Sequence, residues 1–352
     1  MLAGRSIGDL AQEIERRANA KRDYVANTKQ VSFVASDDSK SVRLAIENTG
    51  EFDLTDHTHR QIGTHTEIPA KYYDRMRSNS ADLLIHNVNH WLANNPTQRM
   101  VRTLDGNARA FLSNRYRIID NDQVAAAALP VLLEAGDIQV VSSEITERRL
   151  YIKALFPKIE GEVAKGDVVQ SGVVISNSEV GLGGVRVEPL LYRLVCLNGL
   201  IASSFGQRKN HIGRAFANSD EAYQLYSDET LQKDDEAMLL KIRDTVKAAA
   251  DEAGFKRILD NAREAAELRI EGKIDEVVEL TSKKFSLSEF EASNVLKRLI
   301  EGGSTSKWGL VNAVTATAHM DIEDYDRSVE LERAGGAILD LNQSEWRQLQ
   351  AA

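Results

Sequence analysis

The sequence has a single cysteine, Cys196, so no disulfide bond can form within the chain and nothing requires an oxidising compartment. It has no run of about 18 to 20 apolar residues, which a membrane-spanning helix would need. The opening stretch SIGDLAQEIERRANAKR (6–22) alternates acids and bases, unlike a signal or transit peptide. We therefore expect a cytoplasmic protein with no membrane partner.

The signatures of common catalytic sites are also missing. Histidines and carboxylates cluster in two places, but neither contains the H-E-x-x-H pattern of a zinc enzyme. The two groups are Asp56 with His57, His59 and His65, and Asp82 with His86 and His90. Neutral imidazoles and carboxylates could ligate zinc or iron. Hydrogen-bonded or solvated histidines are the commoner outcome, and we expect no metal and no other cofactor.

Two glycine-rich stretches resemble phosphate-binding loops only superficially. GLGGVR (181–186) falls at the tip of an expected hairpin, and GGSTSKWG (302–309) lacks the G-K-[ST] order of an ATP-binding loop. We interpret the first as a turn and the second as a helix boundary. Cys196 ends an expected strand, which predicts a buried apolar role rather than a nucleophile. The residues indicate no catalytic site and a binding protein rather than an enzyme.

Charge is plentiful but unevenly distributed. The chain has 44 Lys and Arg against 53 Asp and Glu, a formal net charge of −9. Residues 1–214 contain 27 basic and 25 acidic side chains, whereas residues 215–352 contain 17 and 28. This asymmetry indicates distinct roles for the two parts, one of them anion binding, although a solvated acidic helical surface would have the same composition.

Hydrophobic periodicity predicts an α+β fold, with an antiparallel sheet of hairpins and packed helices followed by a mostly helical region. The elements expected first are helices at 8–21, 57–63, 68–76, 80–95 and 123–136, and strands at 30–36, 41–48, 137–145, 148–156, 167–176 and 185–197, with a turn at Asp37 and Asp38. Helices alone are expected afterwards, at 228–254, 255–272, 286–303, 305–320 and 325–339, the third opening with a capping box from Ser288 to Glu291. We predict an α+β, nucleic-acid-binding domain at 1–215 and an acidic helical domain at 216–352.

The run VRTLDGNARAFLSNRYRIID (101–120) carries four arginines in an expected β-hairpin. Asp105 and Gly106 predict a two-residue type I′ turn, which would place Arg102 directly across from Arg109. Alternation then assigns Val101, Thr103, Ala108, Ala110 and Leu112 to the core face, and Met100, Arg102, Arg109 and Phe111 to the other.

Two guanidiniums facing each other across a strand pair repel, so this face predicts a bound anion or a nearby acid. Arginine beside an aromatic ring is also suited to single-stranded nucleic acid, because the fork binds phosphate and the ring stacks on a base. Arg115, Tyr116 and Arg117 repeat the combination, and a second basic group comprises Arg186, Arg193, Arg208, Lys209 and Arg214, with Tyr192 and Phe205. Two alternatives stay open: a three-residue loop would shift the register, and acids from the helices could pair with the arginines.

Four ordered blocks, IPAKYYDRM, VRTLDGNARAFLSNRYRIID, LYRLVCLNGLI and KWGLVNAVTATAH, resemble the phage/plasmid-like protein family of bacteriophages and mobile plasmids, over about residues 60–340. That family is a domain of unknown function. The resemblance implies a mobile-element protein in a bacterial host cell and supplies no catalytic residues. The helix and hairpins from Asp122 to Leu197 are also similar in order to the core of the Rad52-like annealing proteins, an analogy at the level of fold.

We therefore expect a non-enzymatic, single-stranded DNA-binding protein of the annealase type that acts in recombination as a self-associating oligomer. Phosphates would be neutralised by Arg102, Arg109, Arg115, Arg117, Arg193, Arg208 and Lys209, and bases would stack on Phe111 and Tyr116. The alternative is a structural, adaptor or antirestriction protein of the element that acts through protein contacts. A third hypothesis, a metal-dependent hydrolase, would use His57, His59, His86 or His90.

Overall fold

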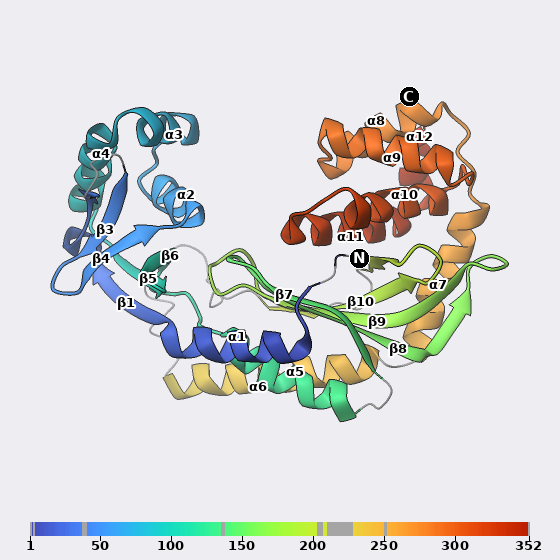
Figure 1. Ribbon diagram of the computed structural model, residues 1–352, viewed down its shortest axis with the longest axis horizontal. Coiled ribbons are helices and arrows are strands. Elements are labelled where there is room, and N and C mark those ends of the chain that lie inside the picture. The colour runs from blue at the N-terminus through green and yellow to red at the C-terminus, as the bar shows by residue number, and fades with distance from the viewer. Residues whose placement is uncertain are drawn as a thin grey trace.

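The computed structural model describes residue 2 and residues 4–36, 41–134, 138–202, 207–209, 228–249 and 252–350. Its elements form two lobes that rise from a common base and leave an open space between them (Figure 1). Helices and mostly antiparallel strands make up both lobes, so the predicted α+β class is confirmed. None of the helices in the described ranges is both long and apolar enough to cross a membrane.

The first lobe, here the N-lobe, is built on a sheet with strand order β1-β5-β6-β4-β3-β2. Its strands are β1 (Arg22–Asn27), β2 (Val31–Ala35), β3 (Val42–Ile46), β4 (Gly50–Leu54), β5 (Gln98–Leu104) and β6 (Asn107–Ser113). A 3-10 turn, η1 (Thr28–Gln30), joins β1 to β2, and the sheet packs with α2 (Asp56–His65), α3 (Ala70–Asn79) and α4 (Ala81–Asn94). Every described strand pair is antiparallel except β4 with β6. Phe33, Leu44, Ile62 and Leu84 lie in this core, all nearly inaccessible to solvent.

The second lobe, here the C-lobe, is built on an antiparallel sheet with strand order β11-β10-β9-β8-β7, and β12 also pairs with β10. Its strands are β7 (Gln139–Ile145), β8 (Leu150–Glu162), β9 (Val168–Asn177), β10 (Val185–Arg193), β11 (Asn198–Ile201) and β12 (Gln207–Lys209). Alternate residues of β8 face opposite sides, as the two-residue period of a strand requires. Ile152 packs with the helices below the sheet, and Tyr151 packs with α11 above it (Figure 1).

The helices of the C-lobe fall into two groups. Beneath the sheet lie α1 (Ile7–Ala20), α5 (Asn121–Glu134) and α6 (Asp228–Ala249), which share a core with β8, β9 and β10. The other helices are α7 (Glu252–Glu267), α8 (Ile274–Phe285), α9 (Glu289–Glu301), α10 (Lys307–Met320), α11 (Tyr325–Leu339) and α12 (Gln343–Gln350). They form a core that includes Val169, Leu191 and Leu200 of the sheet. The C-terminal helices therefore pack onto the second sheet, and the expected boundary near residue 215 lies outside the described residues.

Some predicted local features are confirmed and others are not. Ser288 caps α9, because its hydroxyl accepts from the Glu291 amide and the Glu291 carboxylate accepts from the Ser288 amide. Helix α5 continues through Pro130. The expected strand at 185–197 ends earlier, at Arg193, and turns into β11. Cys196 lies in this turn and is exposed, so its predicted buried role is wrong. The predicted turn at Asp37 and Asp38 lies outside the described residues.

Helix α11 sits directly on the second sheet. Lys153 of β8 is fully buried, and its ammonium forms an ion pair with Glu332 of α11 at 2.6 Å. Tyr151 donates to Asp326 of the same helix at 2.7 Å. Close approach of the backbones requires small residues, and a Cβ atom added at Gly336 would lie only 1.9 Å from the Ile201 carbonyl oxygen.

We expect Gly336→Ala to lower the free energy of unfolding by about 1 to 3 kcal/mol, because α11 must move away from β11 to make room for the methyl group. Gly254→Ala is the matched control, since a Cβ there meets nothing within 4 Å. Alanine favours a helix over glycine, so the control should gain up to about 1 kcal/mol. Urea denaturation followed by circular dichroism measures both, and equal effects would contradict the close packing.

Candidate functional site

The arginine-bearing hairpin has the predicted turn but a different register. Asp105 and Gly106 both have positive φ, 51° and 79°, as a type I′ turn requires. Beyond the expected pair of Thr103 with Ala108, the ladder shifts, and Arg102 lies opposite Ala110 rather than Arg109. Arg109 is the extra residue of a β-bulge. The predicted direct pairing of Arg102 with Arg109 is therefore wrong.

The bulge also exchanges residues between the two faces of the hairpin. Ala110 and Leu112 lie with Met100 in a small cluster that includes Val180, whereas Phe111 lies with Val101 and Ala108 in the N-lobe core. Both faces are covered, one by the N-lobe and the other by the chain that follows β9. The hairpin is therefore buried between the two lobes. The prediction that Arg102, Arg109 and Phe111 face outward is wrong.

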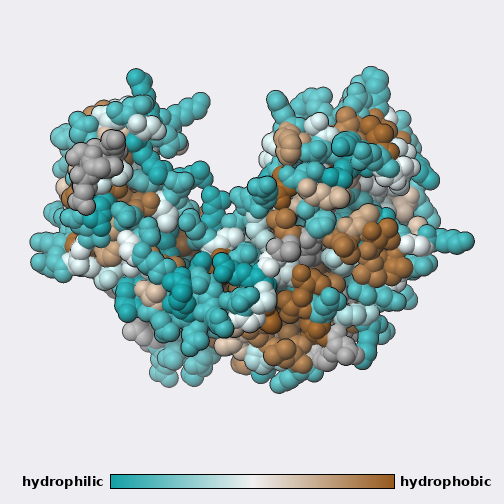
Figure 2. Space-filling view, in the orientation of Figure 1, coloured by the Kyte–Doolittle hydropathy of each residue, from teal (hydrophilic) through white to brown (hydrophobic). Residues whose placement is uncertain are grey.

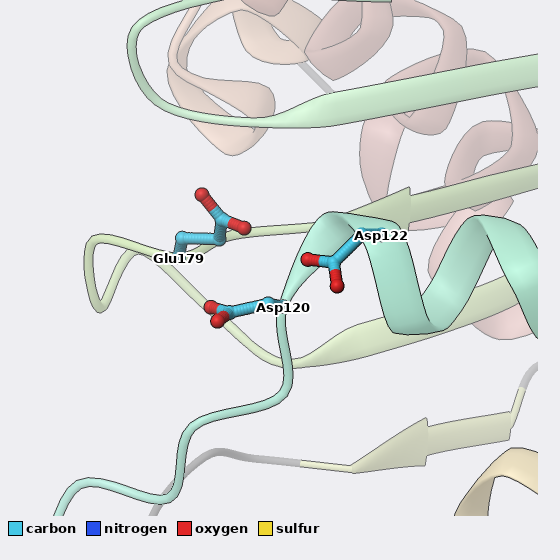
Figure 3. Close-up of side chains that lie close together, drawn as sticks. All are labelled: Asp120, Asp122 and Glu179. Atoms are coloured by element: carbon cyan, nitrogen blue, oxygen red, sulfur yellow. The ribbon is translucent and has the colours of Figure 1, made fainter. Parts of the chain in front are cut away.

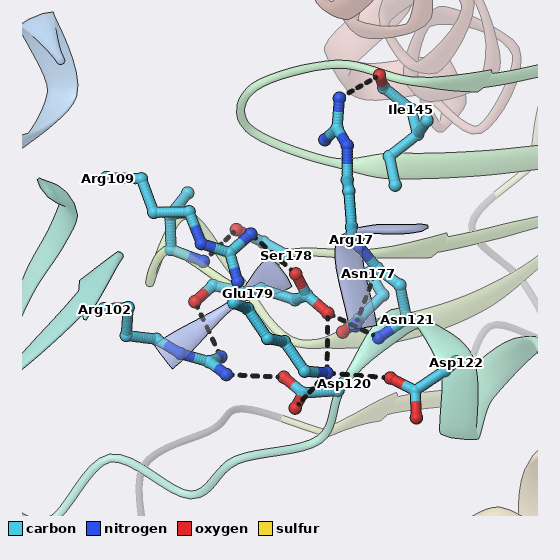
Figure 4. Close-up of polar contacts among 12 residues, drawn as sticks. Arg17, Arg102, Arg109, Asp120, Asn121, Asp122, Ile145, Asn177, Ser178 and Glu179 are labelled. Atoms are coloured by element: carbon cyan, nitrogen blue, oxygen red, sulfur yellow. Dashed lines mark hydrogen bonds and ion pairs between the residues drawn. The ribbon is translucent and has the colours of Figure 1, made fainter. Parts of the chain in front are cut away.

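Arg102 and Arg109 are held by carboxylates of the same chain (Figure 4). Arg102 is fully buried and donates to Asp23 at 2.8 Å, to Asp120 at 2.7 Å and to the Glu179 carbonyl oxygen at 3.1 Å. Arg109 donates to the Glu179 carboxylate at 2.7 Å, and its Nε and Nη2 atoms are buried without a partner among the described residues. The sequence left open that acids of the same chain pair with these arginines. Those acids are Asp23 of β1, Asp120 at the start of α5 and Glu179 in the loop after β9.

Lys21 completes this network. Asp120, Asp122 and Glu179 bring carboxylate oxygens within 4.8 Å of one another, at the start of α5 and in the loop after β9 (Figure 3). The Lys21 ammonium lies 2.6 Å from Asp120, 2.9 Å from Asp122 and 3.9 Å from Glu179. It supplies the positive charge that a metal ion would bring to these carboxylates. Burial alone would raise the pKa of Asp120, but Arg102 and Lys21 outweigh it and hold that pKa below its usual value.

Most of the other predicted binding residues that the structure describes have partners within the chain, and one of them lies far from the hairpin. Tyr116 is buried and donates to the Ser178 carbonyl oxygen at 2.9 Å, and Arg117 pairs with Asp235 of α6 at 2.6 Å. Arg115 is only half-buried. Arg193 pairs with Asp167, far along the second sheet from the hairpin. The side chains of Arg208 and Lys209, and the whole of Phe205 and Arg214, lie outside the described residues.

The nine predicted residues therefore do not form one exposed basic face. A different basic group lies where the lobes meet, at the loop between β9 and β10, residues 178–184, here the glycine loop. In Figure 1, this loop and the neighbouring β7–β8 turn reach from the second sheet toward α2. His57 and Gln61 of α2 both bond the Val180 carbonyl oxygen, at 2.8 and 2.9 Å. The N-lobe is thereby tied to the tip of a C-lobe hairpin.

Three arginines of this junction act electrostatically on His57, and we call them the arginine cluster: Arg60, Arg148 and Arg149. Arg60 lies one helical turn beyond His57, and the Arg148 carbonyl oxygen accepts from Ser178 of the glycine loop at 2.9 Å. Burial lowers the pKa of His57, and the three guanidiniums lower it further. Positive charges close enough to affect one imidazole form a local positive field.

The arginine cluster has little compensation from acids. The Arg60 and Arg148 side chains make no hydrogen bond or ion pair with any described residue. Asp56, beside His57 in the sequence, is ion-paired with Arg77 at 2.7 Å. Glu147, exposed in the β7–β8 turn, has no ion-pair partner within the described ranges. The cluster therefore has no carboxylate partner among the described residues.

The glycine loop brings backbone amides to the same place. Gly181 and Gly183 have positive φ, 84° and 140°, and Arg149 fixes the loop by donating to the Leu182 carbonyl oxygen. A Cβ atom at Gly183 would lie 3.9 Å from Arg149 Nη2 and 4.0 Å from Arg186 Nη2. Arg186 shares the Glu188 carboxylate with Arg333, which binds it more closely, at 2.6 Å against 4.0 Å. Guanidiniums beside such a loop are typical of an anion-binding concavity.

The sequence contains these residues, but its local patterns indicate other features. Arg148 and Arg149 stand at the start of an expected strand at 148–156, although they lie in the turn between β7 and β8. Arg60 lies within DHTHRQIG, where the histidine spacing raises the hypothesis of a metal site rather than a basic one. Those histidines bind separate partners: His59 bonds Tyr73 at 2.8 Å, and His65 accepts from Arg99 at 2.7 Å. Sequence spacing could not predict that α2, the β7–β8 turn and the glycine loop lie together in the fold.

Comparison with protein families now adds one finding. A family model described as a domain of unknown function (DUF932) matches residues 110–335, more than half of the chain. The chain belongs to this family. No curated protein and no solved structure matches the chain. The matched region includes β6 from Ala110, the β7–β8 turn and the glycine loop, but α2 and Arg60 precede it.

We expect Arg102→Met to lower the free energy of unfolding by about 3 to 5 kcal/mol, because Asp120 would remain buried with only one of its two cations. The matched control is Arg16→Met, which removes an exposed arginine paired with Glu13 and Asp105. Exposed pairs contribute at most about 1 kcal/mol. Urea denaturation at neutral pH compares the two, and a small loss for Arg102→Met would show that the buried network is not stabilising.

Stability should also fall between pH 6.5 and 4. Burial, aided by Arg77 for His59 and by Arg99 for His65, lowers both pKa values to about 4. The unfolded chain takes up protons at these histidines near pH 6.5, before the folded chain does, so acidification favours unfolding. Denaturation of the wild type and of the double variant His59→Gln/His65→Gln at pH 7 and pH 5 tests this. An equally steep pH dependence in the variant would exclude these two groups as its source.

Proposed function

We propose that this protein binds single-stranded nucleic acid, most simply DNA, with the phosphate backbone seated on the arginine cluster where the two lobes meet. The observation that carries this proposal concerns two arginines that are anchored at the glycine loop through their backbone or a chain neighbour. Arg60 precedes Gln61, which binds the loop at Val180, and the Arg148 carbonyl oxygen accepts from Ser178 of the loop. Neither guanidinium has a carboxylate partner among the described residues. Partnerless guanidiniums attract phosphates and release the counterions of a nucleic acid, which favours binding. The proposal moves the expected interface from the hairpin to the lobe junction.

The shape of the molecule supports the same proposal. Figure 2 shows the surface hollowed between the lobes, with mainly hydrophilic residues at the base of the hollow. An open hollow lined by hydrophilic residues would accept an extended strand, as the grooves that bind single strands do. The net charge of residues 1–214 is slightly positive even though the whole chain is acidic. A nucleic-acid partner is therefore compatible with the charge of this part.

The finer parts of the proposal concern context and activity. The resemblance of four sequence blocks to phage/plasmid-like proteins leads us to propose a recombination role in a mobile element, within the cytoplasm of a bacterial host. The protein would join complementary strands without ATP and would work as an oligomer. The order of α5 followed by antiparallel β7, β8, β9 and β10 supports the analogy with Rad52-like annealing proteins, as a similarity of element order.

The double variant Arg60→Ala/Arg148→Ala should bind single-stranded DNA more weakly and with a shallower salt dependence. The slope of log affinity against log salt should decrease by roughly 0.7 for each arginine that contacts a phosphate. Fluorescence anisotropy of a labelled oligothymidine over a series of salt concentrations measures both quantities. Because neither side chain has a partner among the described residues, folding should be unaffected.

The matched control is Arg243→Ala/Lys247→Ala, which removes two exposed positive charges from α6, beneath the second sheet. Its affinity and slope should stay close to those of the wild type. Equal losses in both double variants would show that only overall charge matters and would contradict a site at the lobe junction. Annealing is tested by mixing dye-labelled complementary strands without ATP, in the presence and absence of the protein. An equal annealing rate in both mixtures would contradict the annealing activity and leave only single-strand binding.

A further inference from the structure

We infer that the arginine cluster and the glycine loop hold a terminal phosphate, the phosphomonoester at the end of a nucleic-acid strand, in preference to an internal phosphodiester. This inference rests on the proposed function and narrows its ligand. It follows from the concentration of donors at one place, because the cationic groups gather around a single loop rather than along a track.

Arginines of three separate elements belong to this junction. Arg60 lies on α2, which binds the loop through His57. Arg148 and Arg149 come from the β7–β8 turn, and Arg186 comes from β10. The guanidiniums of Arg149 and Arg186 both end within 4.0 Å of the same point beside Gly183. The amides of Gly181 and Gly183 make no hydrogen bond with any described residue, so two N–H donors of the loop lack a partner in this part of the chain.

A terminal phosphate and an internal phosphate differ in charge and in the number of acceptor oxygens, and a cluster of guanidiniums responds to both properties. An internal phosphodiester carries one negative charge on two free oxygens. A phosphomonoester carries about 1.5 to 2 negative charges at neutral pH on three acceptor oxygens. Several guanidiniums around one spot repel each other unless the ligand supplies more than one charge, and forked donors match an oxygen-rich terminus. A phosphomonoester therefore neutralises the positive charge of this site better than an internal phosphodiester does.

The loop is also held in place before any ligand arrives. At its start, the Glu179 side chain binds Arg109 at 2.7 Å and accepts from the Asn121 amide at 2.8 Å. At its middle, Val180 is tied to α2 and Leu182 to Arg149. A site whose groups are already ordered loses less entropy when it binds a small group such as phosphate. An isolated phosphate can therefore be retained without a long strand.

The test compares three oligonucleotides of one sequence, with a 5′-phosphate, a 3′-phosphate or hydroxyl groups at both ends, each carrying an internal fluorophore. We expect one phosphorylated form to bind roughly tenfold or more tightly than the hydroxyl form in anisotropy titrations. The preferred end identifies the polarity of the strand in the site. Inorganic phosphate should compete with that form at concentrations where an equal ionic strength of chloride does not.

Equal affinity for all three oligonucleotides would overturn the terminal-phosphate inference while leaving single-strand binding intact. Failure of every oligonucleotide to bind would overturn the proposed function, and this inference with it. Gly183→Ala should abolish the preference without changing the charge of the protein, because its Cβ would enter the space between Arg149 and Arg186.

Gly166→Ala is the control for that variant. Gly166 also has positive φ, 81°, but a Cβ there meets nothing within 4 Å, and it lies in the turn between β8 and β9. The control also places an alanine at a positive φ, and it should keep the preference for the phosphorylated end. Loss of the preference in both variants would show that strain in the fold, rather than space beside Gly183, caused the effect, and would count against the inference.

Discussion

The structure depends on a buried network of charges at the junction of the two lobes. Its cations are Lys21, Arg102 and Arg109, and its principal anions are Asp23, Asp120 and Glu179. Buried charges are costly to remove from water, and here Arg102, Lys21, Asp120 and Glu179 each have more than one polar partner. The same network places β1, the hairpin, the start of α5 and the glycine loop against one another.

Function, as we propose it, follows from this constraint. Arg102 and Arg109 are buried and paired with acids of the same chain, so they do not face solvent. Their partner Glu179 lies near the start of the glycine loop, and the buried pairs therefore help to hold that loop beside α2. Arg60, Arg148 and Arg149 act electrostatically on His57 at this junction, and none of them forms an ion pair with a described residue. The buried ion pairs of Glu179 thus help to position the arginine cluster, whose side chains have no acid partner among the described residues.

The sequence predicted local structure well and long-range structure poorly. The Asp105-Gly106 turn and the cap at Ser288 depend on a few neighbouring residues, and both are confirmed. The bulge at Arg109 does not follow from alternation, because the extra residue is stabilised by Glu179, 70 residues further on. Strand β4 was missed since its residues, GEFDL, lack an apolar alternation, and its partner β6 is distant in sequence. The like-charge argument assumed that Arg102 lies opposite Arg109, which is wrong. The nearby acid that it left open is present, but Asp23 and Asp120 could be identified as the partners of Arg102 only in three dimensions.

The arrangement of the buried network bears on how the chain can be divided. The region shared with the family begins at residue 110, after Lys21, Asp23, Arg102 and Arg109. A fragment cut at that point would keep Asp120 and Glu179 but lose every cation that neutralises them. The amino-terminal hundred residues are therefore an integral part of the folded structure, which extends beyond the region that the family model matches.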